Sequence, residues 1–421
     1  MPRPRLTLLS ALLLTGCATT PPASQTGSAP APRAESAAPA PARQSEPRTL
    51  GEALSREVTS PLPRKSVEAE GVLFRGAVLA AGTPELMKRP NGVTILTVPI
   101  GTSAPVTCLF YPQPIDAGGA ARSLFESLLE DLTLERARAT EVKVYTGSPA
   151  LYLEADFLQG TAPAARAGRL KVMVHADPVL PKACFHDELG YVKTFLDVTE
   201  SIATGLASTA PEQPVAPYHS DVQVMKLGPQ VLGFQYSALF GSKTGGSIRE
   251  VSTTMVRPGA PAQLQFQDTN ITEQADTAGL LVRKHYVKRI DTTVAANVLL
   301  VRQEDGSYGV EGQVAGKDVK ARLTGELIGE VALAARLREG LLKGQGDAVE
   351  ATMWVPPSDA TAPTRTVVRR RSGEGPGAAT MEVGSLSAKV ELDAHGYPSR
   401  MEVPVGNATI VQERLSQTGE P

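Results

Sequence analysis

The residues best suited to chemistry in this sequence are its cysteines and histidines. The 421-residue chain has three cysteines and five histidines, and Cys184, His186 and Asp187 lie close together. A cysteine with a histidine base and an orienting carboxylate is the arrangement of a nucleophilic thiol. On a strand, however, alternate residues share a face and adjacent residues oppose, so His186 and Asp187 cannot both serve the thiol. We therefore do not expect a catalytic thiol.

A disulfide is the other chemistry open to Cys108 and Cys184, which both lie in segments predicted as strands. Paired cysteines of exported proteins are commonly bridged. If the two strands are neighbours, the cysteines can meet the Cα separation of roughly 5.5 Å that a disulfide requires. The bridge would close a loop of about 77 residues and contribute about 4 kcal/mol by chain entropy. Two buried free thiols are the alternative.

Metal and phosphate chemistry have weaker support. His175 and Asp177 could form half of a metal site, but no second cluster of His, Cys or carboxylates follows at ligand spacing. A histidine at a strand end, paired to a carboxylate or to water, is the simpler interpretation. The glycine-rich stretch 241–247 lacks the spacing of a phosphate loop and is predicted to be a hairpin turn. We expect no catalytic, cofactor-binding or metal-binding residues, and no cofactor.

The elements that would position these residues fall into two segments. In the first, residues 65–210, hydrophobic alternation predicts strands. The predicted ranges are 93–100, 106–111, 141–145, 150–158, 169–175 and 183–186. Helical spacing predicts amphipathic helices from Gly118 through Arg138 and from Tyr191 to Leu206. The expected fold is α+β, an antiparallel sheet with two helices.

The second segment, residues 218–416, is predicted to be a mainly-β curved antiparallel sheet with one helix, Leu327 to Leu342. The proline-rich stretch 211–217 separates it from the first segment as a linker, and residues 417–421 are expected to be a flexible tail. The predicted strands are 231–240, 246–255, 262–271, 280–290, 293–301, 349–355, 364–371, 379–383, 388–392, 399–403 and 409–414. The chain is too long for one ordinary core, so we expect two domains.

The N-terminus has the pattern of an export signal. Arg3 and Arg5 precede the apolar run Leu6 to Leu14, and Leu-Thr-Gly-Cys17 closes it. This segment resembles a bacterial lipoprotein signal peptide, and the tetrad resembles a lipobox. The resemblance implies removal of residues 1–16, lipidation of Cys17 with fatty acids such as palmitate, and, since Ala18 follows, an outer-membrane anchor. The Ala- and Pro-rich residues 17–64 are expected to form a disordered tether.

A second resemblance lies near the C-terminus. Residues 389–406 form a predicted strand, an Asp-x-x-Gly turn and a returning strand that contains Arg-Met-Glu. With the preceding helix, this pattern is similar to the closing hairpin of curved-sheet envelope domains of the DUF3108 or LolA-like kind. It implies a curved sheet and no catalytic residues.

These features predict a location better than an activity. The formal net charge is −2, which favours no nucleic-acid partner. We expect a non-enzymatic envelope lipoprotein, held at the outer membrane by its anchor on an undetermined side, periplasmic or surface, that acts as an accessory or structural protein through protein contacts. The alternative is a binder of a lipid or other apolar ligand on the curved sheet. An enzyme with dispersed catalytic carboxylates is the third hypothesis.

Overall fold

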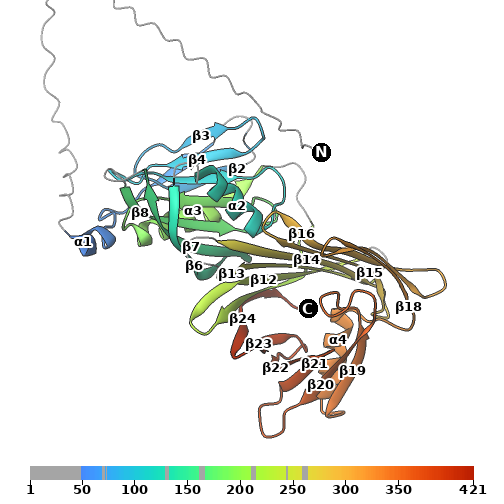
Figure 1. Cartoon of the computed structure of the whole chain (residues 1–421). Helices are drawn as coiled ribbons and strands as arrows, with labels where there is room; N and C mark the ends of the chain where they lie inside the picture. The colour runs from blue at the N-terminus through green and yellow to red at the C-terminus, as the bar shows by residue number, and fades with distance from the viewer. Residues whose placement is uncertain are drawn as a thin grey trace, which may run out of the picture. The chain divides into compact units, whose positions relative to one another are not determined.

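The computed structural model describes residues 49–68, 72, 74–128, 132–160, 166–209, 215–242, 245–257 and 264–421. Residues 47–421 form one compact unit. Within the described ranges the protein is mainly β and consists of antiparallel sheets (Figure 1). The predicted signal peptide, Cys17 and linker residues 211–214 lie outside the described residues.

A seven-stranded sheet contains both cysteines of the predicted disulfide. Its order is β3-β4-β5-β9-β8-β7-β6. The strands are β3 (Glu85–Lys88), β4 (Thr94–Val98), β5 (Val106–Phe110), β6 (Leu132–Tyr145), β7 (Ser148–Gln159), β8 (Arg166–His175) and β9 (Lys182–His186). Helices α2 (Ala117–Leu128) and α3 (Val192–Gly205) contribute to the two cores of this region. A small sheet of β1 (Arg64–Val67), β2 (Phe74–Leu79) and β10 (Leu206–Ser208) lies next to α3.

The larger sheet has fourteen strands in the described ranges, and its order follows the chain except that β11 pairs with β24. The first eight are β11 (His219–Leu227), β12 (Gln230–Gly241), β13 (Ser247–Arg257), β14 (Gln265–Ala275), β15 (Leu281–Ile290), β16 (Thr293–Arg302), β17 (Tyr308–Val314) and β18 (Lys317–Leu323). The remaining strands are β19 (Ala348–Met353), β20 (Thr364–Arg370), β21 (Ala378–Val383), β22 (Leu386–Leu392), β23 (Pro398–Val405) and β24 (Ala408–Gly419). Helix α4 (Glu330–Leu337) and a π-helical turn, η1 (Arg338–Leu342), precede β19.

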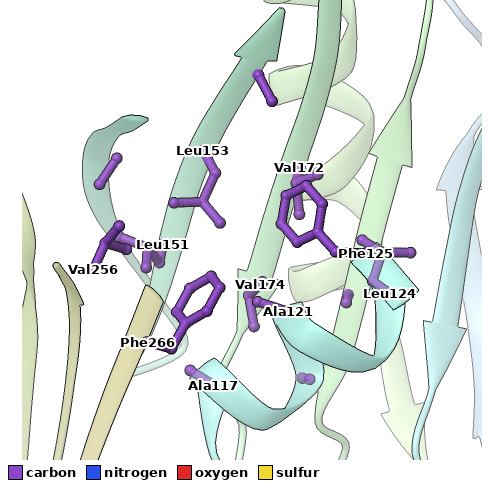
Figure 2. Packing of buried hydrophobic residues seen from close by; sticks show 14 of the residues in the cluster. Ala117, Ala121, Leu124, Phe125, Leu151, Leu153, Val172, Val174, Val256 and Phe266 are labelled. Atoms are coloured by element: carbon purple, nitrogen blue, oxygen red, sulfur yellow. The ribbon is translucent and has the colours of Figure 1, made fainter. Parts of the chain in front are cut away.

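The two large sheets share one hydrophobic core. Phe266 of β14 packs in it with Ala117 and Ala121 of α2 and with Leu151 and Val174 of the seven-stranded sheet (Figure 2). All five side chains are at most 3 % exposed. This shared core explains why residues 47–421 form one compact unit, where the sequence predicted two domains joined by a linker.

The fourteen-stranded sheet has two different faces. Asp268 of β14 bonds to α2, whereas Glu273 of the same strand bonds to the first turn of α4. No register shift separates these residues in the pairing of β14 with β13, and residues an odd number apart on a strand point to opposite sides. We call the α2 side the outer face and the α4 side the inner face.

Three sequence-based boundaries are wrong. Helix α2 ends at Leu128 and strand β6 begins at Leu132, so the helix does not continue to Arg138. Bulges after Leu134 and Ala139 interrupt the alternation of β6, which hides a strand from a search for period two. The predicted tail, 417–421, is also structured in part, because Gln417, Thr418 and Gly419 pair with β11.

The predicted tether is structured at its C-terminal end. Thr49 and Glu52 form a capping box at the start of helix α1 (Leu50–Leu54). Glu57 accepts hydrogen bonds of 2.8 Å from the backbone nitrogens of Lys193 and Thr194, so it satisfies free donors at the start of α3. Residues 49–64 therefore belong to the folded part, where local composition alone predicted a chain without structure.

Other elements were absent from the sequence prediction. Strands β1, β2, β3, β10, β11, β17 and β18 were not predicted, whereas the hairpin joining β12 to β13 matches the turn expected at 241–247. No helix in the described ranges is long and apolar enough to cross a bilayer.

Candidate functional site

The candidate site is a groove of about 670 Å³ on the outer face of the fourteen-stranded sheet. Its walls come from the start of α2, the loop between β8 and β9, and strands β12 to β15. We call it the α2 groove. Apolar atoms come from Pro114, Ile115, Ala176, Pro178, Phe234 and the ring of Tyr236. The groove joins segments from both large sheets, so only the complete fold can form it.

Asp268 holds the start of α2 beside the groove. Its side chain is 1 % exposed and accepts hydrogen bonds from Gly118 N (3.1 Å) and Thr254 Oγ1 (2.8 Å). Arg122 Nη1 lies 3.3 Å from the second carboxylate oxygen. Burial raises the pKa of Asp268, and these donors and Arg122 oppose that rise. A carboxylate from β14 thus caps α2 across the boundary between the sheets.

Gly118 is required by this contact. A Cβ atom at that position would lie 2.4 Å from Asp268 Oδ2, which no side chain permits. The absence of a side chain lets the Gly118 amide approach the carboxylate directly. The sequence signal for the site was therefore a glycine inside the first turn of a predicted helix.

Asp116 makes the second connection between α2 and the sheet. Asn270 Nδ2 donates to Asp116 Oδ1 at 2.6 Å, and Arg289 Nη1 donates to Oδ2 at 2.7 Å. Both partners lie on the outer face, on β14 and β15. Since Asp116 immediately precedes α2, this pair fixes the helix start and compensates the Asp116 charge.

Asp177 is the third compensated carboxylate at the groove. It accepts from the backbone nitrogens of Val179 and Leu180, and Lys182 Nζ lies 3.5 Å away. Burial opposes ionisation, but Lys182, His175 and the two amides together lower the pKa of Asp177. The turn that carries Pro178 is thereby fixed against the groove.

Glu250 differs from these carboxylates. It is exposed, and the described residues offer it no hydrogen bond or ion pair. On the outer face it lies diagonal to Tyr236, because Tyr236 pairs with Ser252 and Ala238 pairs with Glu250. The groove lining therefore contains two compensated carboxylates, Asp116 and Asp177, and one that faces solvent. No group of three or more metal-ligating side chains occurs within the described part of the chain.

The inner face is covered where α4 begins. Lys284 Nζ lies 2.9 Å from Glu273 Oε2, and both side chains are at most 5 % exposed. The Glu330 backbone nitrogen donates to Glu273 Oε1. Burial opposes ionisation of Glu273, but Lys284 and Arg249 lower its pKa. Beneath the start of α4 the inner face thus holds a charged and covered pair.

The disulfide between Cys108 and Cys184 is confirmed. The two residues lie directly opposite each other on β5 and β9, with a Cα–Cα distance of 3.9 Å, shorter than the separation of roughly 5.5 Å that was expected. They are at most 2 % exposed. The bond excludes a catalytic thiol in this state, and Asp187 instead lies 3.6 Å from Arg166.

Two buried histidine–lysine pairs flank the disulfide. Lys171 pairs with His186 across β8 and β9, and His175 pairs with Lys182. Burial first, and the neighbouring lysine second, lowers the pKa of His186 to about 4 and that of His175 to about 3. Both ring nitrogens of His175 lack a hydrogen bond within the described residues. Among the described residues, His175 and Asp177 do not belong to a group of three or more metal-ligating side chains.

Sequence reasoning missed one contact with catalytic residue types. Ser103 Oγ lies 3.1 Å from His186 Nε2 and donates to Glu188 Oε2 at 2.6 Å. Glu188 also accepts from the Ala104 backbone nitrogen. The serine proton is thus directed to the carboxylate instead of the histidine, and His186 is fully buried. The contact closes the loop between β4 and β5, and no sequence spacing could have indicated it.

Comparisons with known proteins assign no function to the site. No family model matches the chain, and no curated protein matches it. A solved structure of a β-barrel-like protein of the domain of unknown function DUF1849 from Brucella abortus is similar, with 13 % identity and a TM-score of 0.39. The match covers 49 % of this chain and 99 % of that one.

Proposed function

We propose that this protein is a non-enzymatic cell-envelope lipoprotein that binds a partner protein in the α2 groove. The observation that carries the proposal is the groove itself, a space of about 670 Å³ with apolar walls and a few fixed polar groups. Binding sites commonly combine these properties. Bonds from Asp268 and Asp116 hold α2 against the sheet, so the site is preformed and loses little entropy on binding.

The proposed location follows from the N-terminal sequence. Cys17 would carry the acyl chains, and three chains would hold the protein to the outer membrane essentially permanently, at about 0.8 kcal/mol for each buried CH₂. The α+β segment, 65–210, and the mainly-β curved segment, 218–416, would act as one binding body, since both contribute walls to the groove. An apolar ligand on the curved sheet has less support, because its inner face contains Glu273 and Lys284.

Photo-crosslinking in the native envelope tests this proposal. Thr272, an exposed residue of the groove wall, is replaced by a photoreactive amino acid. Thr409, an exposed threonine of β24, is the matched control. We expect a discrete cross-linked protein from position 272 only, and loss of membrane fractionation in Cys17→Ala. Equal cross-linking from both positions, or none from 272, would contradict the proposal.

A further inference from the structure

The charge balance of the α2 groove indicates the sign of the charge that its ligand carries. Asp116 is compensated by Arg289, Asp268 by Arg122 and Asp177 by Lys182. These bonds already determine the fold of the walls, so those carboxylates are not free for a ligand. The groove is left with one negative charge that has no counter-ion among the described residues.

That charge belongs to Glu250, and an aromatic ring lies beside it. Diagonal neighbours on one face of an antiparallel pair are close enough for long side chains to meet. Burial raises the pKa of Tyr236, the hydrogen bond with Ser220 opposes this, and the Glu250 carboxylate raises it further. The two side chains therefore share one electrostatic environment. A carboxylate next to an aromatic face favours a cation, which the ring also attracts.

The apolar wall sets the shape of the cation. Ile115, Pro114 and Pro178 line the groove together with Tyr236 and Glu250. A ligand that satisfies all of them needs an aliphatic stem with a positive end. Lysine and arginine side chains have this form, because they lay their methylene groups on apolar surface and keep the charged end polar.

Resting on the proposed function, we propose that the α2 groove binds a lysine or arginine side chain of a partner protein's exposed segment, with Glu250 as its counter-ion. Glu250 would accept hydrogen bonds from the cation, and Tyr236 would pack on its stem. A peptide is favoured as the occupant because the groove offers one uncompensated negative charge beside apolar walls. A single basic residue between alanine or proline residues matches both features.

Fluorescence anisotropy with the full chain in detergent tests this inference. The probe is a labelled alanine–proline peptide with one central arginine, and the same peptide with neutral citrulline is its control. We expect the arginine peptide to bind at least about ten-fold more tightly than the citrulline peptide, as one charge-assisted contact predicts. Glu250→Gln should abolish that preference. Glu311→Gln is the matched control, because Glu311 of β17 is exposed and lies, like Glu250, on the outer face.

Each outcome separates this inference from the proposed function. Equal binding of both peptides, or a preference that survives Glu250→Gln, would overturn the basic-residue inference. If cross-linking at Thr272 still identifies a protein, the proposed function stands without the basic-residue inference. Glu250-dependent binding of phosphatidylethanolamine vesicles with no binding of the arginine peptide would also overturn the inference, since the ligand would then be a lipid amine.

Discussion

The outer and inner faces of the fourteen-stranded sheet both bury charged side chains, but they use them differently. On the outer face, Asp268 and Asp116 attach α2 to the sheet and leave a groove beside it. On the inner face, Glu273 and Lys284 pair beneath α4. Outer-face charges thus fix the walls of an open space, whereas inner-face charges lie within packed structure.

This difference shows why burial alone does not identify a binding site. Buried pairs offer little net stability compared with apolar packing, but they are costly to break because the remaining charge is uncompensated. Both faces should therefore be sensitive to mutation. Only variants of outer-face residues should lose partner binding while the protein remains folded.

The largest effect is expected on the inner face. Glu273→Ala leaves the Lys284 ammonium buried without its carboxylate, which should lower the free energy of unfolding by about 3 to 5 kcal/mol. Denaturant unfolding measures this loss. The double variant Glu273→Leu with Lys284→Met removes both charges and should recover most of the stability. A single variant within 1 kcal/mol of wild type, on the order of an exposed pair, would show that the inner pair is not truly buried.

Acid should destabilise the seven-stranded sheet, which packs against the outer face. The folded-state pKa of His186 is about 4, against an ordinary value of 6.5. The unfolded chain therefore binds the proton first, and stability is lost as pH falls from 6.5 towards 4, by about 3 kcal/mol at most. His186→Gln should flatten this part of the stability curve. His285→Gln, which replaces a partly exposed histidine of β15, is the control substitution.

A smaller loss is expected at the outer-face junction. Asp268→Ala removes the acceptor for Gly118 N and Thr254 Oγ1 and should cost about 2 kcal/mol. Because α2 would then be less firmly held, hydrogen exchange of its first-turn amides should increase. Unchanged exchange at Gly118 would contradict the role of Asp268 as a cap.

Acid titration provides a sharper comparison between the faces. Glu273 has a lowered pKa, so its contribution is present above pH 4.5 and is lost as pH falls further. Asp268 has a raised pKa, so the folded state takes up its proton first and gains stability relative to the unfolded chain as pH falls. Glu273→Gln should make the acid loss shallower and Asp268→Asn should make it steeper. Changes of the same sign would contradict the difference between the faces.

Local patterns in the sequence predicted many strands, the hairpin turn at 241–247 and the cysteine pair, because alternation and turn residues act over short distances. They failed at β6, where bulges break the alternation and Leu124, Leu128 and Leu132 also fit a helical period. They failed again at Glu57, whose role as a cap depends on residues far along the chain.

The site itself lay beyond sequence reasoning. Gly118 and Asp268 are 150 residues apart, and Asp116 and Arg289 are 173 apart. Nothing local distinguishes these carboxylates from solvated ones. Their role follows only from the packing of one sheet on the other, which the prediction of two separate domains did not include.

The most direct test of the outer face as the binding face is cross-linking from Thr272 in two folded variants. Glu250→Gln alters the groove alone, whereas Glu273→Leu with Lys284→Met alters the inner face alone. We predict that the cross-link to the partner is lost in the Glu250 variant and retained in the inner-face variant. Retention in Glu250→Gln together with loss in the inner-face variant would contradict the account.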